Sequence, residues 1–350
     1  MSAPDAELRP LALDDYERIR QLGRSFALDL PREEDWRRLW LDNPLRERFG
    51  DALPLGWALE TGSGELVGTM GTVWVPYSFR GDAVISAVSR AWFVKAEFRA
   101  LGLQLMDEYL HQKNVDLCIN TAVSVPAHEA FRRFCEPVPA GQWDRGSYWD
   151  IRNDDISASA LRQPSTAVQV EFVGRFDARF DDFWRDMVRL NPEKLLADRS
   201  LRTLTWHFGS PLRRGRLWIL TASVDGRLVA YCTLTRQDDA FALPALAYAG
   251  PPGTSSMRVV DYQYLEPENG ILAAFLTAAL NRCSVENIGF LENLGCGVPK
   301  MHALDNAAPH VKALPNWKFY YTATDQRFVA ELKAPEVWDP SAYDGDASFE

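Results

Sequence analysis

Apolar residues up to residue 140 alternate between two spacings, one typical of helices and one typical of strands. Leu13–Gly23 carries apolar side chains at helical intervals, and Asp35–Leu41 is a second amphipathic segment, which Asn43-Pro44 ends. The later runs of this region predict the strands Gly56–Glu60, Glu65–Trp74, Ala83–Val94 and Val115–Asn120 and the helices Leu101–Lys113 and Ala127–Phe134. Helices that alternate in this way with a hairpin and single strands indicate an α+β fold.

A similar succession of elements returns in the second half of the chain. Phe180–Leu190 predicts a helix that stops at Asn191-Pro192, as Asp35–Leu41 stops at Asn43-Pro44. The runs that follow predict the strands Leu217–Val224, Arg227–Thr235, Met257–Leu265 and Ile288–Glu292 and the helix Gly270–Arg282. We therefore expect a duplicated fold, with domains at residues 1–152 and 167–334, a polar linker at 153–166 and an irregular tail at 335–350.

Composition and charge narrow the class of protein. With 47% hydrophobic and 25% charged residues, the chain has enough apolar surface for packed cores. Its net charge of -10 argues against broad contact with nucleic acid, which requires a basic surface. We find no signal-peptide pattern and no apolar stretch long enough to span a bilayer, so we expect a cytoplasmic protein. The five cysteines and five histidines lack metal-ligand spacing, and we expect no metal.

The segment Ala91–Leu110 carries the most informative chemistry. A predicted strand runs through Arg99-Ala100-Leu101-Gly102 into a predicted helix. The first turn of a helix leaves backbone N–H groups unpaired, and the helix dipole adds partial positive charge at the same place. Such a turn favours phosphate groups, and a glycine lets the backbone approach them closely. We therefore expect a pyrophosphate site at this turn.

The equivalent turn of the second half differs in charge. Leu265–Gly270 contains Glu266 and Glu268 and has no arginine. Two carboxylates disfavour an anion at that position because like charges repel. The sequence therefore predicts that only the first half binds a phosphorylated cofactor.

The segment around Arg99 resembles the GNAT superfamily of acyl-CoA-dependent N-acyltransferases. The family signature, Arg/Gln-x-x-Gly-x-Gly/Ala between the fourth strand and the third helix, is matched by Arg99 and Gly102, with Gln104 at the last position. Trp36, Trp40 and Asn43-Pro44 are similar to a segment of a bacterial GNAT subgroup. The resemblance implies two tandem GNAT-like domains, each a mixed, mostly antiparallel sheet flanked by helices. It also implies acetyl-CoA or a longer acyl-CoA as co-substrate.

The resemblance further implies which residues bind the donor. In the family an amine attacks the acyl thioester directly within a ternary complex, and a backbone N–H of the fourth strand polarises the thioester carbonyl. Here that N–H belongs to Phe93 or Val94. The acceptor amine is one of a small molecule, an amino sugar or a peptide, and an acyl carrier protein is an alternative donor. The implied donor-binding residues are Phe93, Val94, Arg99, Ala100, Leu101, Gly102 and Leu103.

Three residues near the fifth predicted strand are candidates for catalysis. Asn120 ends that strand and is suited to hydrogen bonding with substrate or with the pantetheine arm. His128 and Glu129 open the next predicted helix and are acid or base candidates by chain position. Each also has a structural interpretation: a turn for Asn120, a partly exposed site for His128 and a favourable first-turn acid for Glu129. The tyrosine that often protonates the leaving thiolate in this family corresponds to Phe131 here.

Two other functions fit the same pattern. One is a double-GNAT module that binds acyl-CoA or a partner without turnover, which Gln104 and Phe131 favour. The other is a FemAB-like aminoacyltransferase, which also has two GNAT-like halves but requires a basic surface for tRNA. The net charge of -10 is opposed to that surface.

Overall fold

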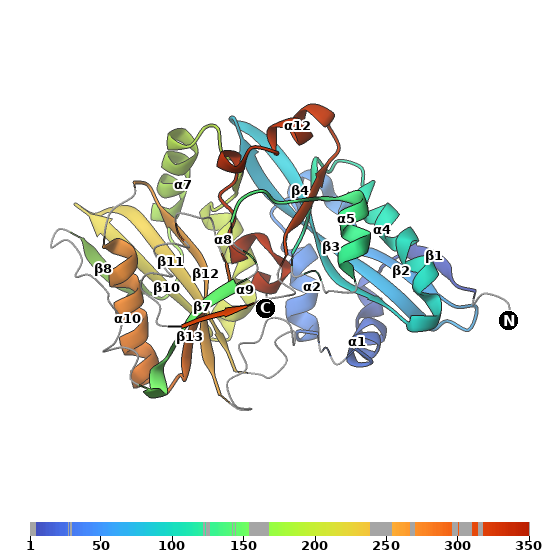
Figure 1. Cartoon of the computed structure of the whole chain (residues 1–350), viewed down its shortest axis with the longest axis horizontal. Coiled ribbons are helices and arrows are strands. Elements are labelled where there is room, and N and C mark those ends of the chain that lie inside the picture. The colour runs from blue at the N-terminus through green and yellow to red at the C-terminus, as the bar shows by residue number, and fades with distance from the viewer. Residues whose placement is uncertain are drawn as a thin grey trace.

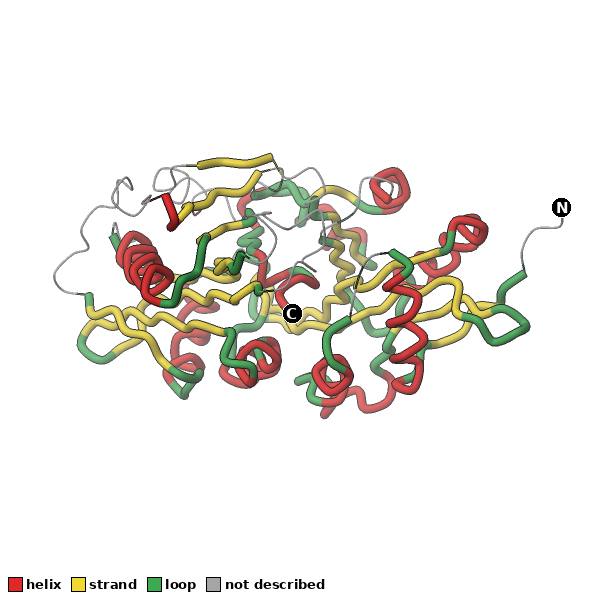
Figure 2. Tube along the Cα trace, turned by 90° about the horizontal axis from the view of Figure 1, so that it is seen from below, coloured by secondary structure: helices red, strands yellow, loops and turns green. Residues whose placement is uncertain are grey.

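A computed structural model describes residues 5–26, 28, 30–121, 123, 127–141, 143, 145–153, 168–238, 254–266, 270–295, 300, 310–313 and 318–349. Among these residues the strands form two sheets that lie side by side, with the C-terminal end of the chain between them (Figure 1, Figure 2). The predicted α+β class with two mostly antiparallel sheets is confirmed. The core of the predicted linker, residues 154–166, lies outside the described residues.

The first sheet is built mainly from the N-terminal part of the chain. All its strand pairs are antiparallel except β4 with β5, which are parallel. Its strands, in spatial order, are β1 (Glu7–Pro10), β2 (Gly56–Glu60), β3 (Leu66–Phe79), β4 (Asp82–Val94), β5 (Leu117–Asn120), β15 (Tyr320–Ala323) and β6 (Glu136–Pro137), and β9 (Leu196–Ala197) pairs with β3. The helices of this part are α1 (Tyr16–Arg24), α2 (Glu33–Leu41), α3 (Arg46–Phe49), α4 (Gly102–Leu110) and α5 (His128–Phe134).

The second sheet repeats this plan. Again a single pair is parallel among the described strands, here β12 with β13. In spatial order the strands are β14 (His310–Ala313), β7 (Arg145–Asp150), β13 (Phe290–Asn293), β12 (Ser256–Tyr264), β11 (Arg227–Gln237), β10 (Leu217–Val224) and β8 (Gln169–Val173). The helices after β8 along the chain are α7 (Arg179–Leu190), α8 (Leu201–His207), α9 (Gly209–Arg213), α10 (Ile271–Val285) and α12 (Gln326–Glu331), of which α12 contacts β15 of the first sheet.

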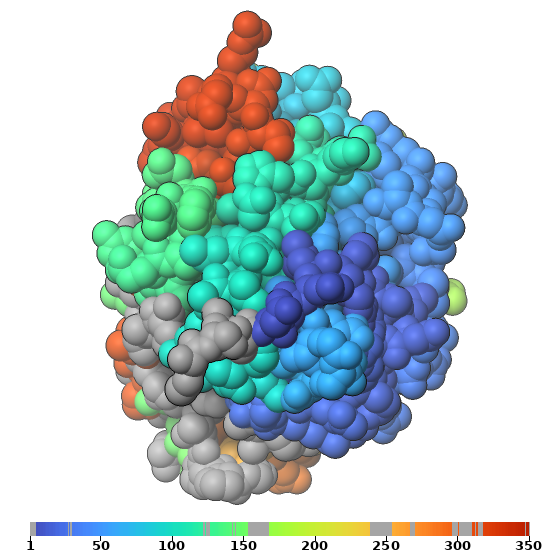
Figure 3. All heavy atoms as spheres, turned by 90° about the vertical axis from the view of Figure 1, so that its right-hand side faces the viewer, coloured from blue at the N-terminus to red at the C-terminus, as the bar shows by residue number. Residues whose placement is uncertain are grey.

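The two sheets exchange strands, so their limits differ from the predicted domain limits. β7 precedes the predicted linker at 153–166 but pairs with β13 and β14 in the second sheet. β15 belongs to the predicted domain 167–334 but pairs with β5 and β6 in the first sheet. In Figure 3 the C-terminal segment that includes α12 accordingly lies against the first half of the molecule. Neither sheet is therefore complete without a strand from the other part of the chain.

The apolar core follows from the spacing of apolar residues along each helix. In α7, Phe180, Phe183 and Met187 share one face and are buried, and the first two pack their rings on Tyr231 of β11, each with centroids 5.3 Å apart. This cluster is continuous with buried residues of α2, β3 and β4, so one core joins the two halves. The other faces are covered by α4 and α5 on the first sheet and by α10 on the second.

The tail is more ordered than the sequence predicts. Residues 335–349 contain three short 3-10 turns, Pro335–Val337, Ala342–Asp344 and Asp346–Phe349. Tyr343 and Phe349 are almost fully buried. The aromatic side chains of the tail belong to the core that the two halves share.

A buried ion pair joins the tail to both sheets. Arg199, which follows β9, makes two hydrogen bonds to Asp261 of β12, from Nε to Oδ2 at 2.8 Å and from Nη2 to Oδ1 at 3.1 Å. The tail residue Ser341 donates its hydroxyl to Asp261 Oδ1 at 3.0 Å, and Tyr77 of β3 donates to Asp344 at 2.7 Å. Although burial opposes ionisation, the charge of Arg199 lowers the pKa of Asp261 to about 2.

We predict that Asp261→Asn lowers the free energy of unfolding by about 3–5 kcal/mol, because it leaves the buried Arg199 cation without its counter-charge. Urea unfolding followed by tryptophan fluorescence measures this change. The matched control is Asp182→Asn, which breaks an exposed pair with Arg185 and should change stability by no more than about 0.5 kcal/mol. Equal effects of the two variants would show that the buried pair does not hold the halves together.

Candidate functional site

The end of β4 is distorted at the position where the sequence predicts the donor site. The pairing of β3 with β4 shifts between Thr69 and Gly71, so that Ala91 and Trp92 bulge out of the ladder. Ala91 has a φ of 53°, a conformation uncommon for residues other than glycine. After the bulge Phe93 stacks on Phe26 with ring centroids 5.5 Å apart. Phe93 and Val94 still pair with Thr69 and Gly68 of β3, and the extra residue of the bulge shifts their side chains to the opposite faces of the sheet.

The predicted phosphate-binding turn lies directly after this bulge. A 3-10 helix, Ala96–Leu101, intervenes between β4 and α4, whereas the sequence predicts a direct passage from strand to helix. Arg99, Ala100 and Leu103 are exposed and Leu101 is half-buried. No side chain caps the start of α4, and its first turn contains no acidic residue. The N–H of Gly102 donates to the carbonyl of Arg99, so the 3-10 helix satisfies part of this turn, and no carboxylate in the first turn of α4 competes for the rest.

Gly102 has a packing role in this structure. It is buried, and a Cβ atom at its position would lie 3.4 Å from Val94 Cγ2 and 3.9 Å from Trp92 Cζ2. Its φ of -58° is an ordinary helical value. The glycine therefore brings the start of α4 close to β4, and alanine fits there without strain.

Asn120 lies where β4 and β5 separate. The two strands pair only from Ser86 to Val88 and from Leu117 to Ile119, and β4 continues to Val94 without β5. The Asn120 side chain is fully buried, and neither its Oδ1 nor its Nδ2 has a hydrogen-bond partner. The indole Nε1 of Trp92 is also buried without a partner. Buried polar groups are nearly always hydrogen-bonded, so we expect a water molecule or a ligand to complete the hydrogen bonds of these groups.

At the equivalent strand end of the second half, the described residues show a different arrangement. Asn293 ends β13, the strand equivalent to β5, and engages a partner. One residue earlier, Glu292 forms a buried ion pair with Arg258 of β12, with Nε and Oε1 2.8 Å apart. Residues 267–269 of the acidic turn lie outside the described residues. The described part of this turn contains Gly270 with a φ of 119°.

The other two catalytic candidates, His128 and Glu129, are less buried than Asn120. His128 is half-buried, and its Nε2 donates to the carbonyl of Val123 at 2.8 Å, because a carbonyl oxygen only accepts. The Glu129 side chain is 85% exposed and pairs with Arg132, so its carboxylate faces solvent. Phe131 packs between Trp92 and Tyr320. The structure thus places Asn120 and Trp92 at the separation of the strands and Glu129 on the outer surface.

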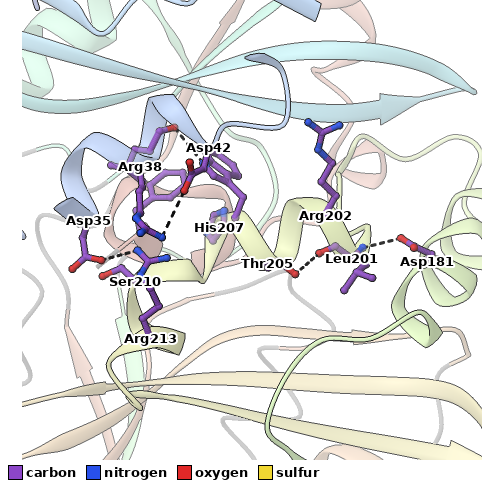
Figure 4. Close-up of a pocket in the computed structure, with 13 residues that line it drawn as sticks. Asp35, Arg38, Asp42, Asp181, Leu201, Arg202, Thr205, His207, Ser210 and Arg213 are labelled. Carbon is purple, nitrogen blue, oxygen red and sulfur yellow. Dashed lines mark hydrogen bonds and ion pairs between the residues drawn. The ribbon is translucent and has the colours of Figure 1, made fainter. Parts of the chain in front are cut away.

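A cavity of about 560 Å³ lies between the two halves (Figure 4). Three segments that are distant in sequence form it: α2, the region from α7 to α9, and the end of the tail. Its charged lining consists of Asp35, Asp42, Asp181, Arg38, Arg202 and Arg213, and its other lining residues are Leu39, Leu201, Thr205, Trp206, His207, Ser210 and Phe349.

The tail connects this cavity to the separation of β4 and β5. Asp346 accepts a hydrogen bond from the hydroxyl of Thr121, at 3.1 Å, and its carbonyl accepts one from Arg90 Nη1, also at 3.1 Å. Three residues later Phe349 lines the cavity. A 3-10 turn rises about 2 Å per residue, so only about 6 Å of chain separates the two places.

His207 forms part of the cavity wall as a neutral imidazole. Its ring stacks on Tyr343, with centroids 4.0 Å apart, and its Nε2 lies 2.7 Å from the hydroxyl of Ser348. That hydroxyl donates to the carbonyl of Gly345 at 2.6 Å, so it accepts from Nε2–H. Nδ1 is therefore an acceptor, and it has no partner. Burial is the main cause that lowers the pKa of His207 to about 3.

Several other features limit the chemistry of the described residues. Burial raises the pKa of the Cys118 thiol well above its usual range, so this cysteine is not a nucleophile at neutral pH. In the part of the chain that the structure describes, no three His, Cys, Asp or Glu side chains gather in a way that could hold a metal ion. No helix formed by these residues combines the length and apolar character needed to cross a bilayer.

The overall arrangement is similar to that of solved structures described as N-acetyltransferases, an N-myristoyltransferase and a probable N-acyltransferase. A conserved Enterococcus faecalis V583 protein, described as a probable N-acyltransferase, matches 91% of this chain over 73% of its own, with a TM-score of 0.59 and 13% identity. A GCN5-related N-acetyltransferase from Kribbella flavida matches 92% over 72% of its own chain, with a TM-score of 0.58 and 12% identity. N-myristoyltransferase from Saccharomyces cerevisiae, solved with bound myristoyl-CoA, matches 92% over 83% of its own chain, with a TM-score of 0.55 and 10% identity.

These likenesses define the fold. The chain has the tandem GNAT fold, and the resemblance to the GNAT superfamily is confirmed at that level. No protein-family model matches the sequence, and no curated protein matches it significantly.

Sequence reasoning missed the cavity, the role of the tail and the bulge at Ala91. Aromatic residues in the last fifteen positions, such as Trp338, Tyr343 and Phe349, are a signal of burial that could have placed the tail in the core. Arg213 and Arg214 both bind Asp35 of α2, at 2.7 and 2.5 Å. No local sequence pattern predicts that pairing between the two halves.

We predict that Asn120→Leu raises the free energy of unfolding by about 1–2 kcal/mol. The substitution keeps the shape of the side chain and removes a buried amide that lacks partners, whose desolvation costs about 1–3 kcal/mol. Urea unfolding without ligand measures the change. A loss of stability would show that the Asn120 amide is hydrogen-bonded within the protein and has a structural role.

We further predict that His207 makes the stability of the protein depend on pH. The folded state holds its pKa near 3, whereas the unfolded value is about 6.5. The unfolded state therefore binds more protons between these values, and stability falls as pH drops below 6.5, by up to about 1.4 kcal/mol per pH unit from this group. In His207→Gln this part of the decline should disappear in unfolding measurements at pH 7, 6 and 5. An equally steep decline in the variant would contradict the buried neutral state.

Proposed function

We propose that this protein transfers an acyl group from acyl-CoA to the amino group of a small hydrophilic acceptor, and that one donor binds per chain, in the first half. The observation that carries the proposal is the buried Asn120 amide without partners at the separation of β4 and β5. Such an unpaired group is expected where a ligand completes the hydrogen bonds.

The first half offers a contact for each part of acyl-CoA: the pyrophosphate, the pantetheine arm and the thioester. Its pyrophosphate lies at the start of α4, where Arg99, Ala100 and Leu103 are exposed and the first turn of α4 contains no acidic residue. Its pantetheine arm contains amides, which offer both a donor and an acceptor to Asn120 and an acceptor to Trp92 Nε1. The thioester then lies beside the end of β4, where the N–H of Phe93 or Val94 polarises its carbonyl.

The acceptor reaches the thioester from the cavity between the halves. Its neutral amine attacks the thioester carbon, the new C–N bond forms, and the C–S bond breaks. The amine loses one proton to a base or to water, and the CoA thiolate gains one. His128 is the nearer candidate for a proton relay, since the Glu129 carboxylate faces solvent and pairs with Arg132. Phe131 supplies no acid, and CoA thiolate is a tolerable leaving group without one.

We predict that Leu103→Glu weakens acetyl-CoA binding by about ten- to a hundredfold. Leu103 is exposed in the first turn of α4, so the change adds a carboxylate beside the proposed phosphate position without disturbing the core. A like charge at about 4 Å costs about 1 kcal/mol in water and about 4 kcal/mol at an effective dielectric of 20. Calorimetric titration with acetyl-CoA measures the affinity and the number of sites.

The control is Leu103→Gln, which has nearly the same shape and no charge and should bind acetyl-CoA as the parent protein does. The site assignment is wrong if both variants bind with equal affinity. Release of free thiol with an amine acceptor then tests turnover. Tight binding with no thiol released under any acceptor would favour the alternative of a non-catalytic acyl-CoA-binding module.

A further inference from the structure

The cavity between the halves carries charges of both signs in equal number. Three aspartates and three arginines line it. Asp35 is already neutralised, because Arg213 and Arg214 donate to its two oxygens and lower its pKa against the opposing effect of burial. The charged lining residues that remain available to bind a ligand are therefore the acids Asp42 and Asp181 and the bases Arg38 and Arg202.

The acidic groups are only partly satisfied. Asp42 has its nearest described cation at 3.9 Å, on Arg38, which is too far for a hydrogen bond. One oxygen of Asp181 accepts from the backbone N–H of Leu201 at 2.8 Å. Arg202 has a single described partner, the exposed Glu47, at 2.6 Å. In Figure 4, Asp42 and Arg38 project from α2, and Arg202 and Asp181 lie at the other end of the cavity.

The wall of the cavity also contains buried polar atoms with no partner. Nδ1 of His207 is a hydrogen-bond acceptor, as its bond to Ser348 requires, and the residue is 1% exposed. The hydroxyl of Ser210, a residue 9% exposed, also lacks a partner. Nδ1 of His207 requires a hydrogen-bond donor, such as an N–H group of a ligand, whereas the hydroxyl of Ser210 can donate or accept.

We propose that the cavity binds a zwitterionic amine of the size of an amino acid or short peptide, with its ammonium group near Asp42 and His207 and its carboxylate near Arg202. This inference rests on the proposed acyl transfer and names its acceptor. A volume of about 560 Å³ exceeds what such a ligand fills and falls within the usual range for small-molecule sites. A polycation without acidic groups is disfavoured, because each aspartate of the lining is matched by an arginine that would repel it.

After the ammonium group loses a proton to solvent, its nitrogen attacks the thioester carbon, the C–N bond forms and the C–S bond breaks. CoA leaves as the thiol, with the second amine proton transferred to it through water. The products are the N-acylated zwitterion, now an anion, and free CoA.

The test compares L-alanyl-L-alanine, its C-terminal amide and spermidine. Binding without CoA is measured by calorimetry, and release of free thiol is measured with acetyl-CoA present. The dipeptide should bind at least about tenfold more tightly than its amide and than spermidine. The variant Arg202→Gln should weaken the dipeptide about five- to tenfold and leave the amide unchanged, whereas Asp42→Asn should weaken both.

Arg185→Gln is the matched control, since Arg185 is an exposed arginine paired with one carboxylate and lies outside the cavity lining. It should bind all three ligands as the parent protein does. Equal or tighter binding of the amide or spermidine, or no effect of Arg202→Gln on the dipeptide, would overturn the proposal, even where thiol release shows that acyl transfer itself occurs. Binding of the dipeptide with the predicted variant effects but without thiol release would instead uphold the ligand class and refute acyl transfer.

Discussion

The buried ion pair of Arg199 and Asp261 is the interaction on which the placement of the two halves depends. Removing two charges from water is costly, and the cost is offset only when their remaining hydrogen bonds are made. Here Asp261 accepts from Arg199, from Tyr231 at 2.7 Å, from Gln263 at 2.9 Å and from Ser341 at 3.0 Å. The second sheet supplies Asp261, Tyr231 and Gln263, and the tail supplies Ser341. Arg199 follows β9, a strand of the first sheet. A network of this kind is satisfied in few arrangements, so it fixes how the three parts meet.

The same constraint explains why the candidate site has two sides. By holding the tail between the halves, the network brings Asp346 to the separation of β4 and β5 and Phe349 to the wall of the cavity. The duplicated fold then becomes asymmetric. The first half keeps an unpaired amide at the end of its parallel strand, whereas the second half has a buried ion pair between the corresponding strands. A single donor site in the first half, with the acceptor cavity beside it, is the arrangement that we infer.

Local patterns predicted the local structure well. Gly56–Glu60 and Leu217–Val224 have the bounds that their alternating side chains and nearby turns predict, because a hairpin depends on residues close in sequence. The exchanged strands β7 and β15 could not be predicted in this way, since their pairing depends on partners more than a hundred residues away. Asn120 was identified as a candidate from its place at a strand end, but its lack of partners is a property of the packed core. The cavity escaped prediction because its charged residues come from segments that only the folded chain brings together.

Hydrogen exchange with and without acetyl-CoA tests whether the donor binds to the first half, because it locates binding on the chain. Acetyl-CoA should slow exchange of backbone amides in residues 89–104, which cover the end of β4 and the start of α4. It should cause no change in residues 256–275, which contain the equivalent strand β12 and the start of α10. Protection of residues 256–275, or no protection in either segment at saturating acetyl-CoA, would contradict a donor site in the first half.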